Sequence, residues 1–381
     1  MTDGLQFPAS AQADAAPYRV LARKYRPRTF GQLIGQEALV RTLTNAIKSG
    51  RIAHAFVLTG VRGVGKTTTA RIIARALNCE SGPTIQPCGT CRQCVAIAED
   101  RHLDIVEIDA ASRTGVDDMR DLIDSIPYKP VEGRYKVYII DEVHMLSKSA
   151  FNAILKTVEE PPEHVKFIFA TTEARKIPAT ILSRCQRFDL RRVEADRLSE
   201  HFRSIAAQEG TRIDEEALAL LSRAADGSVR DGLSLLDQAI AMSAGPVTGD
   251  AVRGMLGLTD RSLILDVVEF ALAGDAPRAL ASVRRIRDAG GDPSLALKDM
   301  LELVHFVSVA AVAPQQATDP SVPEAERTRG MAMAKRAGLN GAQAAWASLI
   351  KAVPELQSAP APAQALEMAV LRLAGQFAPR R

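Results

Sequence analysis

The residues best suited to chemistry in this chain form a glycine-rich segment from residue 60 to residue 68. Its defined positions are Gly60, Gly63, Gly65, Lys66, Thr67 and Thr68. Glycines at these spacings let successive backbone N–H groups turn toward an anion, and the start of a following helix adds its positive end. Lys66 can then reach the β and γ phosphates of a nucleotide, and the Thr67 hydroxyl can ligate Mg²⁺. A chance glycine-rich turn before a surface helix is the alternative.

The sequence on either side supports a phosphate-binding loop. Residues 54–59 form an apolar run short enough for a strand, and Ala70, Ile73 and Leu77 follow with helical spacing. Strand, glycine-rich loop and helix in this order are the setting in which such a loop holds phosphate.

Two acidic residues, Asp141 and Glu142, directly follow a nearly all-apolar run at residues 136–140. A carboxylate at the tip of a buried strand beside a phosphate loop is placed to ligate Mg²⁺, and we assign Asp141 to this role. Glu142 can activate an attacking water. Either residue alone would be an ordinary charge at a strand end, but together with the phosphate loop they predict ATP hydrolysis.

Three further polar residues near these strands have less specific signals. Thr171 and Thr172 follow the apolar run 167–170, where a hydroxyl could orient the attacking water. Ordinary strand-end threonines are the alternative, because threonine is common in strands. We expect His144 to face solvent on the helix that follows Glu142.

Four of the five cysteines lie in one short segment, at Cys79, Cys88, Cys91 and Cys94. Without a secretion signal, disulfides are disfavoured, and the paired x2 spacings suit tetrahedral coordination of zinc by thiolates. An iron–sulfur cluster and unligated thiols are the alternatives. The residues between the cysteines form turns with almost no core, so a metal would hold the shape of the segment. A site closed by four protein ligands would be structural.

Length and charge set broad limits. A chain of 381 residues should hold two or three domains. Its 48 basic and 45 acidic side chains nearly cancel, so any nucleic-acid face must be local. No apolar stretch approaches the ~20 residues that a membrane span needs. Residues 1–17 lack the features of a signal peptide and are predicted to be a disordered tail. We therefore expect a soluble, cytoplasmic protein without membrane contact.

The elements that must position these residues alternate between strand and helix. Apolar runs at 104–109, 136–140 and 167–170 fit parallel strands covered on both faces, and a helix is expected at about 36–48. The pattern predicts a doubly wound α/β sheet with function at the carboxyl ends of its strands. A basic, aromatic arm at 18–27 is either a solvated arm or lies against a nucleotide base.

From residue 189 onward the signal is helical. Three helices are expected at 195–208, 214–225 and 229–242. After residue 257 the helical pattern continues, with breaks expected near 290–291, 314–323 and 354–362. A helical terminal third without a catalytic constellation is typical of an assembly domain.

Several segments together resemble one known family. They are residues 140–146 (Ile-Asp-Glu-Val-His-Met-Leu), 155–162 (Leu-Lys-Thr-Val-Glu-Glu-Pro-Pro), 183–185 (Ser-Arg-Cys) and 227–231 (Gly-Ser-Val-Arg-Asp). With the phosphate loop and the cysteine insert, they resemble the gamma/tau subunit of the bacterial DNA polymerase III clamp loader, an AAA+ ATPase. The resemblance covers about residues 18–375.

The resemblance implies an AAA+ P-loop parallel-sheet domain at 18–190 with a zinc-binding insert at about 79–94. A small helical lid domain at 191–256 and an all-helical collar, or oligomerisation domain, at 257–381 would follow.

The resemblance also implies roles for single residues. Lys66 and Thr67 would bind phosphate and Mg²⁺, Asp141 the metal, and Glu142 would be the catalytic base. Thr172, rather than Thr171, matches the first sensor of the family.

Two arginines acquire roles only through the family. Arg184 would be an arginine finger acting on ATP held by the neighbouring subunit. Arg230 would be the second sensor, which touches the γ-phosphate from the lid of its own subunit. Without the resemblance, each arginine would be interpreted as a member of a surface salt bridge.

The implied function is that of the ATP-hydrolysing motor subunit of the replicative clamp loader, with ATP, Mg²⁺ and Zn²⁺ as cofactors. Implied partners are the other clamp-loader subunits, with several copies of this chain, the sliding clamp and primer–template DNA. The polymerase III core and the helicase would bind only through a longer C-terminal tail, and this chain would not itself polymerise DNA. An AAA+ DNA helicase or branch-migration motor, and a non-catalytic nucleotide-binding scaffold, are the alternatives.

Overall fold

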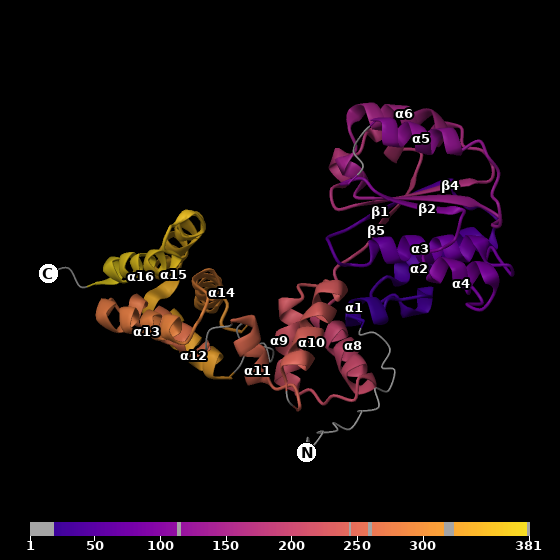
Figure 1. Cartoon of the computed structure of the whole chain (residues 1–381). Coiled ribbons are helices and arrows are strands. Elements are labelled where there is room, and N and C mark those ends of the chain that lie inside the picture. The colour runs from indigo at the N-terminus through magenta and orange to yellow at the C-terminus, as the bar shows by residue number, and fades with distance from the viewer. Residues whose placement is uncertain (1–18, 113–115, 244, 258–260, 316–323, 379–381) are drawn as a thin grey trace, which may run out of the picture. The chain divides into compact units, whose positions relative to one another are not determined.

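The computed structural model describes residues 19–112, 116–243, 245–257, 261–315 and 324–378. The chain divides into two compact units, Met1–Thr248 and Gly249–Arg381 (Figure 1). The tail predicted at residues 1–17 lies outside the described residues. Among the helices of the described ranges, none combines the length and the apolar character that a membrane span requires.

The first unit is built on a five-stranded, all-parallel sheet. Its strands are β1 (Ala55–Thr59), β2 (Ile105–Asp109), β3 (Lys136–Asp141), β4 (Val165–Thr171) and β5 (Gln186–Asp189). Their order across the sheet is β2-β3-β4-β1-β5, and every neighbouring pair is parallel. The predicted parallel sheet is confirmed. The sequence analysis placed no strand at β5, which has four residues, of which Phe188 alone is buried.

Both faces of the sheet are buried, as the apolar runs predicted. Successive residues of β3 alternate between two cores, since Val137 packs on one face and Tyr138 on the other. One face is covered by α2 (Glu37–Lys48), α3 (Lys66–Asn78) and α4 (Arg92–Ala98). The other is covered by α5 (Val116–Ser125) and α6 (Lys148–Glu159) (Figure 1).

Short helical turns join these elements. They are α1 (Leu21–Lys24), η1 (Phe30–Gln32), η2 (Val143–Met145), η3 (Ala174–Lys176) and α7 (Ala179–Leu182). Helix α1 belongs to the arm at residues 18–27 and is tied to the last helix of the unit, because the Leu21 N–H donates to Asp237 Oδ2 at 3.2 Å.

The predicted three-helix group follows the sheet as α8 (Ala195–Gln208), α9 (Glu215–Ala224) and α10 (Val229–Met242). Side chains cap two of these helices: Asp214 accepts from the Ala217 N–H at 2.6 Å, and Ser228 accepts from the Asp231 N–H at 3.2 Å. The first turn of α10 lies close to the phosphate loop, because the Arg230 N–H donates to the Gly63 carbonyl at 3.3 Å.

The second unit is helical. Its helices are α11 (Gly249–Leu256), α12 (Arg261–Leu272), α13 (Ala276–Asp288), α14 (Pro293–Val312), α15 (Glu324–Ser358) and α16 (Pro362–Phe377). Helices α12 to α16 enclose one large aliphatic core that includes Val268, Leu297, Val304 and Leu373. The break predicted near 290–291 is confirmed. Of the break expected at 314–323, residues 316–323 lie outside the described residues.

The break predicted at 354–362 is confirmed at residues 359–361, between the end of α15 at Ser358 and the start of α16 at Pro362, although α15 continues through Pro354. The buried side chains of Leu349 and Leu356 on either side of Pro354 hold this stretch against the core. The unpredicted irregularity lies at Gly338, whose φ of 62° interrupts the helix. Tertiary packing therefore outweighs the cost of a missing N–H donor at Pro354.

Candidate nucleotide and metal sites

The phosphate loop joins the end of β1 to the start of α3. Gly60, Gly63 and Gly65 all have positive φ, at 148°, 79° and 101°. At Gly63 an added Cβ would lie 1.9 Å from Ser228 Oγ at the start of α10. Only glycine can combine this backbone with so close an approach of the lid helix.

Lys66 lies inside the loop, with its side chain 5% exposed. Its ammonium donates to the carbonyl oxygens of Gly60 at 3.0 Å and Val61 at 3.1 Å. Burial lowers its pKa, while Glu142, whose carboxylate lies 4.0 Å away, works in the opposite direction. The ammonium is thus held within the loop by weak acceptors, which a phosphate group could replace.

The Thr67 hydroxyl and the Asp141 carboxylate meet as the motifs predicted. Thr67 Oγ1 donates to Asp141 Oδ2 at 2.6 Å, and Asp141 Oδ1 accepts from the Glu142 N–H at 2.9 Å. One hydroxyl and one carboxylate beside a phosphate loop form a donor set that suits Mg²⁺, which binds few protein oxygens together with substrate phosphates.

Glu142 sits at the tip of β3 in the left-handed region, with a φ of 45°. Its Oε2 accepts two hydrogen bonds from Thr172, one from the N–H and one from the hydroxyl, both at 3.1 Å. Thr171, by contrast, is fully buried and its hydroxyl lies 3.0 Å from His144 Nδ1. The geometry therefore joins Thr172, and not Thr171, to the acidic residue.

The expectation that His144 faces solvent was wrong. Its side chain is 8% exposed, and Nδ1 lies 3.3 Å from Glu142 Oε2. Nε2 lies 3.5 Å from Glu173 Oε1. The residues after Glu142 form the 3₁₀ turn η2, which directs the imidazole toward the end of β4. His144 thus contacts the carboxylate that we expect to activate water.

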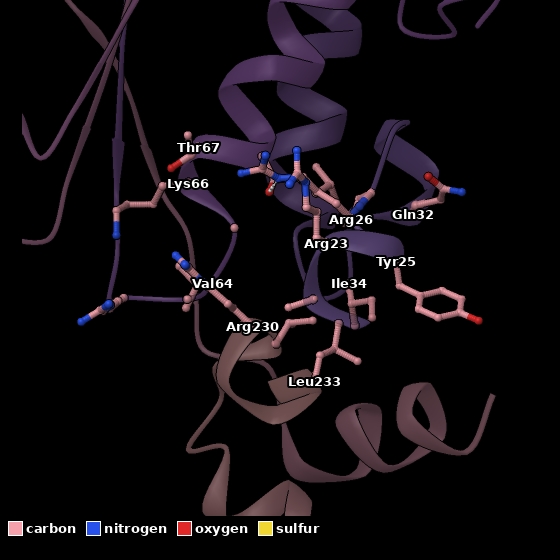
Figure 2. Close-up of a pocket in the computed structure, with 18 of the residues that line it drawn as sticks. Arg23, Tyr25, Arg26, Gln32, Ile34, Val64, Lys66, Thr67, Arg230 and Leu233 are labelled. Carbon is pink, nitrogen blue, oxygen red and sulfur yellow. Dashed lines mark hydrogen bonds between the residues drawn. The ribbon is translucent and has the colours of Figure 1, made fainter. Parts of the chain in front are cut away.

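A hollow of about 730 Å³ lies between the phosphate loop, the N-terminal arm and the lid (Figure 2). Its lining includes Lys66, Thr67, Asp141 and Glu142, with Arg230 and Leu233 from α10 on the opposite wall. The arm contributes Arg23, Tyr25, Arg26 and Pro27. Of the two alternatives for the arm, its position beside the hollow supports the one that places it against a nucleotide.

The two arginines of the resemblance occupy different surroundings. Arg230 is exposed, lines the hollow, and donates its N–H to the Gly63 carbonyl at 3.3 Å. Arg184 is not among the lining residues and pairs with Glu159 at 2.9 Å, which is the surface salt bridge given as the alternative. The structure brings Arg230 to the site of its own subunit and leaves Arg184 outside it.

Two kinds of lining residue were not predicted from the sequence. Arg26 donates from Nε to Thr68 Oγ1 at 3.2 Å. The basic character of the arm indicated a possible anion contact, but not which residue Arg26 would meet. Leu233 and His201 come from the lid. Leu233 follows Arg230 by three residues and so shares its helix face, a spacing that could have indicated it.

The four predicted cysteines come together between the end of α3 and α4. Their sulfur atoms all lie within 4.8 Å of one another. Backbone N–H groups donate to three of them: Cys88 to Cys79 at 3.4 Å, Cys91 to Cys88 at 3.3 Å, and Cys94 to Cys91 at 3.4 Å. Such bonds favour thiolates, and they lower the pKa of Cys88 to about 6. Four convergent sulfurs with N–H donors form a donor set compatible with zinc.

The sheet order, the phosphate loop after β1, the acidic pair at the end of β3 and the helical lid define an AAA+ P-loop protein. Residues 35–194 match the family described as DNA polymerase III, delta subunit. Residues 197–245 match the DNA polymerase III clamp loader subunit, ATPase lid domain, and residues 247–380 match DNA polymerase III subunits gamma and tau domain III.

Named relatives agree with these matches. The chain is 44% identical over 363 residues to DNA polymerase III subunit tau of Salmonella typhimurium, covering 95% of this chain and 56% of the relative. It is 47% identical over 302 residues to DNA polymerase III subunit tau/gamma of Haemophilus influenzae, covering 79% of this chain and 44% of the relative. It is 39% identical over 356 residues to DNA polymerase III subunit gamma of Buchnera aphidicola subsp. Acyrthosiphon pisum, covering 93% of this chain and 98% of the relative. The chain belongs to the DNA polymerase III gamma/tau family, and it spans about half the length of the first two relatives.

Proposed function

We propose that this chain is the ATP-hydrolysing motor subunit of a replicative clamp loader, which opens a sliding clamp and loads it onto primer–template DNA. The observation that carries the proposal is that the phosphate loop, the Asp141 carboxylate and the Glu142 carboxylate border one hollow. Family membership supports the setting in DNA replication.

The family descriptions, which name a clamp loader subunit and DNA polymerase III, support the proposed partners. We place this chain, in several copies, beside the other clamp-loader subunits, with the sliding clamp and primer–template DNA as macromolecular partners. The polymerase III core and the helicase would join through a longer C-terminal tail. The complex would work in the cytoplasm, and this chain would hydrolyse ATP without polymerising DNA.

The proposed division of labour begins with binding. The backbone of Gly60, Gly63 and Gly65 and the Lys66 ammonium hold the phosphates, and Thr68 at the start of α3 borders them. Thr67 and Asp141 would hold Mg²⁺, which when bound neutralises charge between the β and γ phosphates.

Hydrolysis then depends on Glu142. Its carboxylate accepts the proton of the attacking water, while Thr172 fixes the carboxylate through the two hydrogen bonds described above. Arg230 approaches the γ-phosphate from the lid of its own subunit. Arg184, which does not line its own hollow, serves the neighbour.

We also propose the domain boundaries given by the resemblance: the ATPase at 18–190, the lid at 191–256 and the collar at 257–381. The division of the chain after Thr248 falls within the proposed lid, eight residues before its end at 256. It supports a separate helical assembly region in the last third.

The proposal is tested by ATP turnover of the reconstituted complex. We expect turnover to rise when the sliding clamp and primed DNA are both present, because these partners complete the subunit interfaces that a motor of this class uses. Blunt duplex DNA of the same length is the control substrate. Turnover that is unchanged by clamp and primed DNA would contradict the clamp-loader assignment, and strand displacement by the isolated chain would favour the helicase alternative.

The cysteine cluster is proposed to hold one structural Zn²⁺ through Cys79, Cys88, Cys91 and Cys94. The ion would fix the turns of residues 79–94. It would take no part in hydrolysis, because four protein thiolates leave no open coordination position. Burial raises the pKa of Cys94 to about 12, so a bound cation would be needed to keep this thiol deprotonated near neutral pH.

Cys91→Ser is expected to release the metal and to disorder the segment around it, while ATP binding stays close to wild type. Elemental analysis should find about one zinc per wild-type chain, with Zn–S distances of ~2.3 Å by X-ray absorption. The matched control is Cys185→Ser, since Cys185 lies outside the cluster, and it should keep the metal. Iron in place of zinc, or full zinc content in Cys91→Ser, would refute the site.

A further inference from the structure

A second hollow of about 620 Å³ lies between the N-terminal arm, α3 and α4. Six arginines line it: Arg19, Arg23, Arg26, Arg28, Arg71 and Arg75. We call it the arginine groove. Arg19, Arg28, Arg71 and Arg75 do not line the nucleotide hollow, so the groove is a distinct surface that adjoins it through Arg23 and Arg26.

The positive charge of the groove is largely uncompensated. The two carboxylates in its lining already have partners, since Asp100 pairs with Arg71 and Glu99 pairs with Arg101. Arg71 also pairs with Glu107 at 2.7 Å. For the other five arginines of the groove, no ion pair within 4.0 Å is found among the residues that the structure describes. This local excess contrasts with the near balance of the whole chain.

Arg75 is the one buried arginine among the six. Its side chain is buried, with 6% of the residue exposed. Its terminal nitrogens donate to the carbonyls of Arg28 at 3.0 Å and Gly89 at 3.2 Å, but its Nε has no partner in the described structure. The Cys94 thiol is a hydrogen-bond partner of Arg75, so the cysteine cluster lies beside this cation and the uncompensated charge of the groove rests on the other arginines. Burial, and next the Arg71 charge, lower the pKa of Arg26, which shows how closely the charges are crowded.

The chemistry of the lining selects the kind of anion. Planar guanidinium groups form paired hydrogen bonds with phosphate oxygens. The other lining residues are aliphatic or small, such as Ile72, Val95 and Ile97, and the lining contains no aromatic ring on which a base could stack. Recognition would therefore rest on phosphates and would be independent of base sequence.

We propose that the arginine groove binds consecutive phosphate groups, either along a single-stranded nucleic-acid backbone or in a free polyphosphate. The volume of the groove and the spread of four arginines along residues 19–28 exceed what a single phosphate needs. The inference does not depend on ATP hydrolysis, because Arg19 and Arg28 border only this groove.

The test uses the full chain with a non-hydrolysable ATP analogue saturating the nucleotide hollow. A labelled oligothymidylate is titrated at several salt concentrations, and inorganic tripolyphosphate is titrated as a competitor and, by calorimetry, alone. The test variant is Arg19→Ala with Arg28→Ala, both exposed. The control is Arg41→Ala with Arg51→Ala, which removes two exposed arginines that line neither hollow.

If the oligonucleotide is the ligand, the test variant should bind it more weakly and lose about 1.4 from the slope of log affinity against log salt, about 0.7 for each phosphate contact on a single strand. The control should keep the wild-type slope. Tripolyphosphate binding that is lost in the test variant, without oligonucleotide binding, would support the free polyphosphate instead.

Two outcomes overturn the proposal: equal behaviour of test and control variants toward both probes, or an acidic peptide such as hexaglutamate binding as tightly as the phosphate probes. ATP binding is measured in the same variants. If the wild-type chain does not bind ATP, the proposed function is contradicted. The comparison of test and control variants still decides the groove, because neither pair of arginines lines the nucleotide hollow.

Discussion

Complexes that carry Arg184→Ala are expected to hydrolyse ATP about 10³- to 10⁵-fold more slowly than wild type, although every subunit still binds ATP. A guanidinium aimed at the γ-phosphate stabilises the charge that develops during transfer. Within one chain Arg184 lies on the surface, paired with Glu159 and away from the lining of the hollow. Its effect should therefore fall on the neighbouring subunit.

The decisive measurement mixes Arg184→Ala with Lys66→Ala. The first variant has an intact nucleotide hollow and the second an intact arginine, so a mixed interface can unite the two and recover turnover. Arg187→Ala is the matched control, because Arg187 is exposed, lies three residues after Arg184 and pairs with Asp189, and the variant should behave as wild type. If no mixture recovers turnover while both variants assemble normally, the arginine does not act in trans.

Glu142→Gln should keep nucleotide binding and lose about 10²- to 10⁴-fold in hydrolysis, the range for a positioned general base. Glutamine keeps the shape of the side chain and can still accept from Thr172, but it cannot take a proton from water. Lys66→Ala should instead abolish nucleotide binding, because it removes the cation buried within the phosphate loop.

Binding of a fluorescent ATP analogue and single-turnover hydrolysis separate the two effects. Glu163→Gln, which neutralises an exposed carboxylate outside the hollow, is the control for loss of one negative charge. Turnover in Glu142→Gln close to wild type would refute the assignment of the base. Normal nucleotide affinity in Lys66→Ala would refute the role of the ammonium.

The sheet could be predicted wherever apolar runs were long enough, because a parallel strand buried on both faces is nearly all apolar. Strand β5 could not be predicted in this way, because Arg187 and Asp189 interrupt its apolar character. Its place at the edge is fixed by pairing with β1, more than 120 residues earlier in the chain. Pro354 shows the opposite case, in which a strong local breaker is overruled by the aliphatic core on both sides.

The site could be predicted where residues adjoin in sequence or belong to a motif, as do Lys66, Thr67, Asp141 and Glu142. The burial of His144 depends on the end of β4, and the lining by the arm depends on how residues 19–27 lie beside the start of α3. Such contacts join elements that are distant in sequence, and no spacing rule encodes them. The family supplied the roles of Arg184 and Arg230, which their local sequence did not.

The hydrogen bond from the Arg230 N–H to the Gly63 carbonyl has a mechanical consequence. The backbone that would wrap the phosphates and the first turn of α10 are joined directly, with no side chain between them. The same 14-residue helix is tied to the arm through the hydrogen bond from the Leu21 N–H to Asp237. We therefore expect the loop, the lid and the arm to respond together when a phosphate enters or leaves.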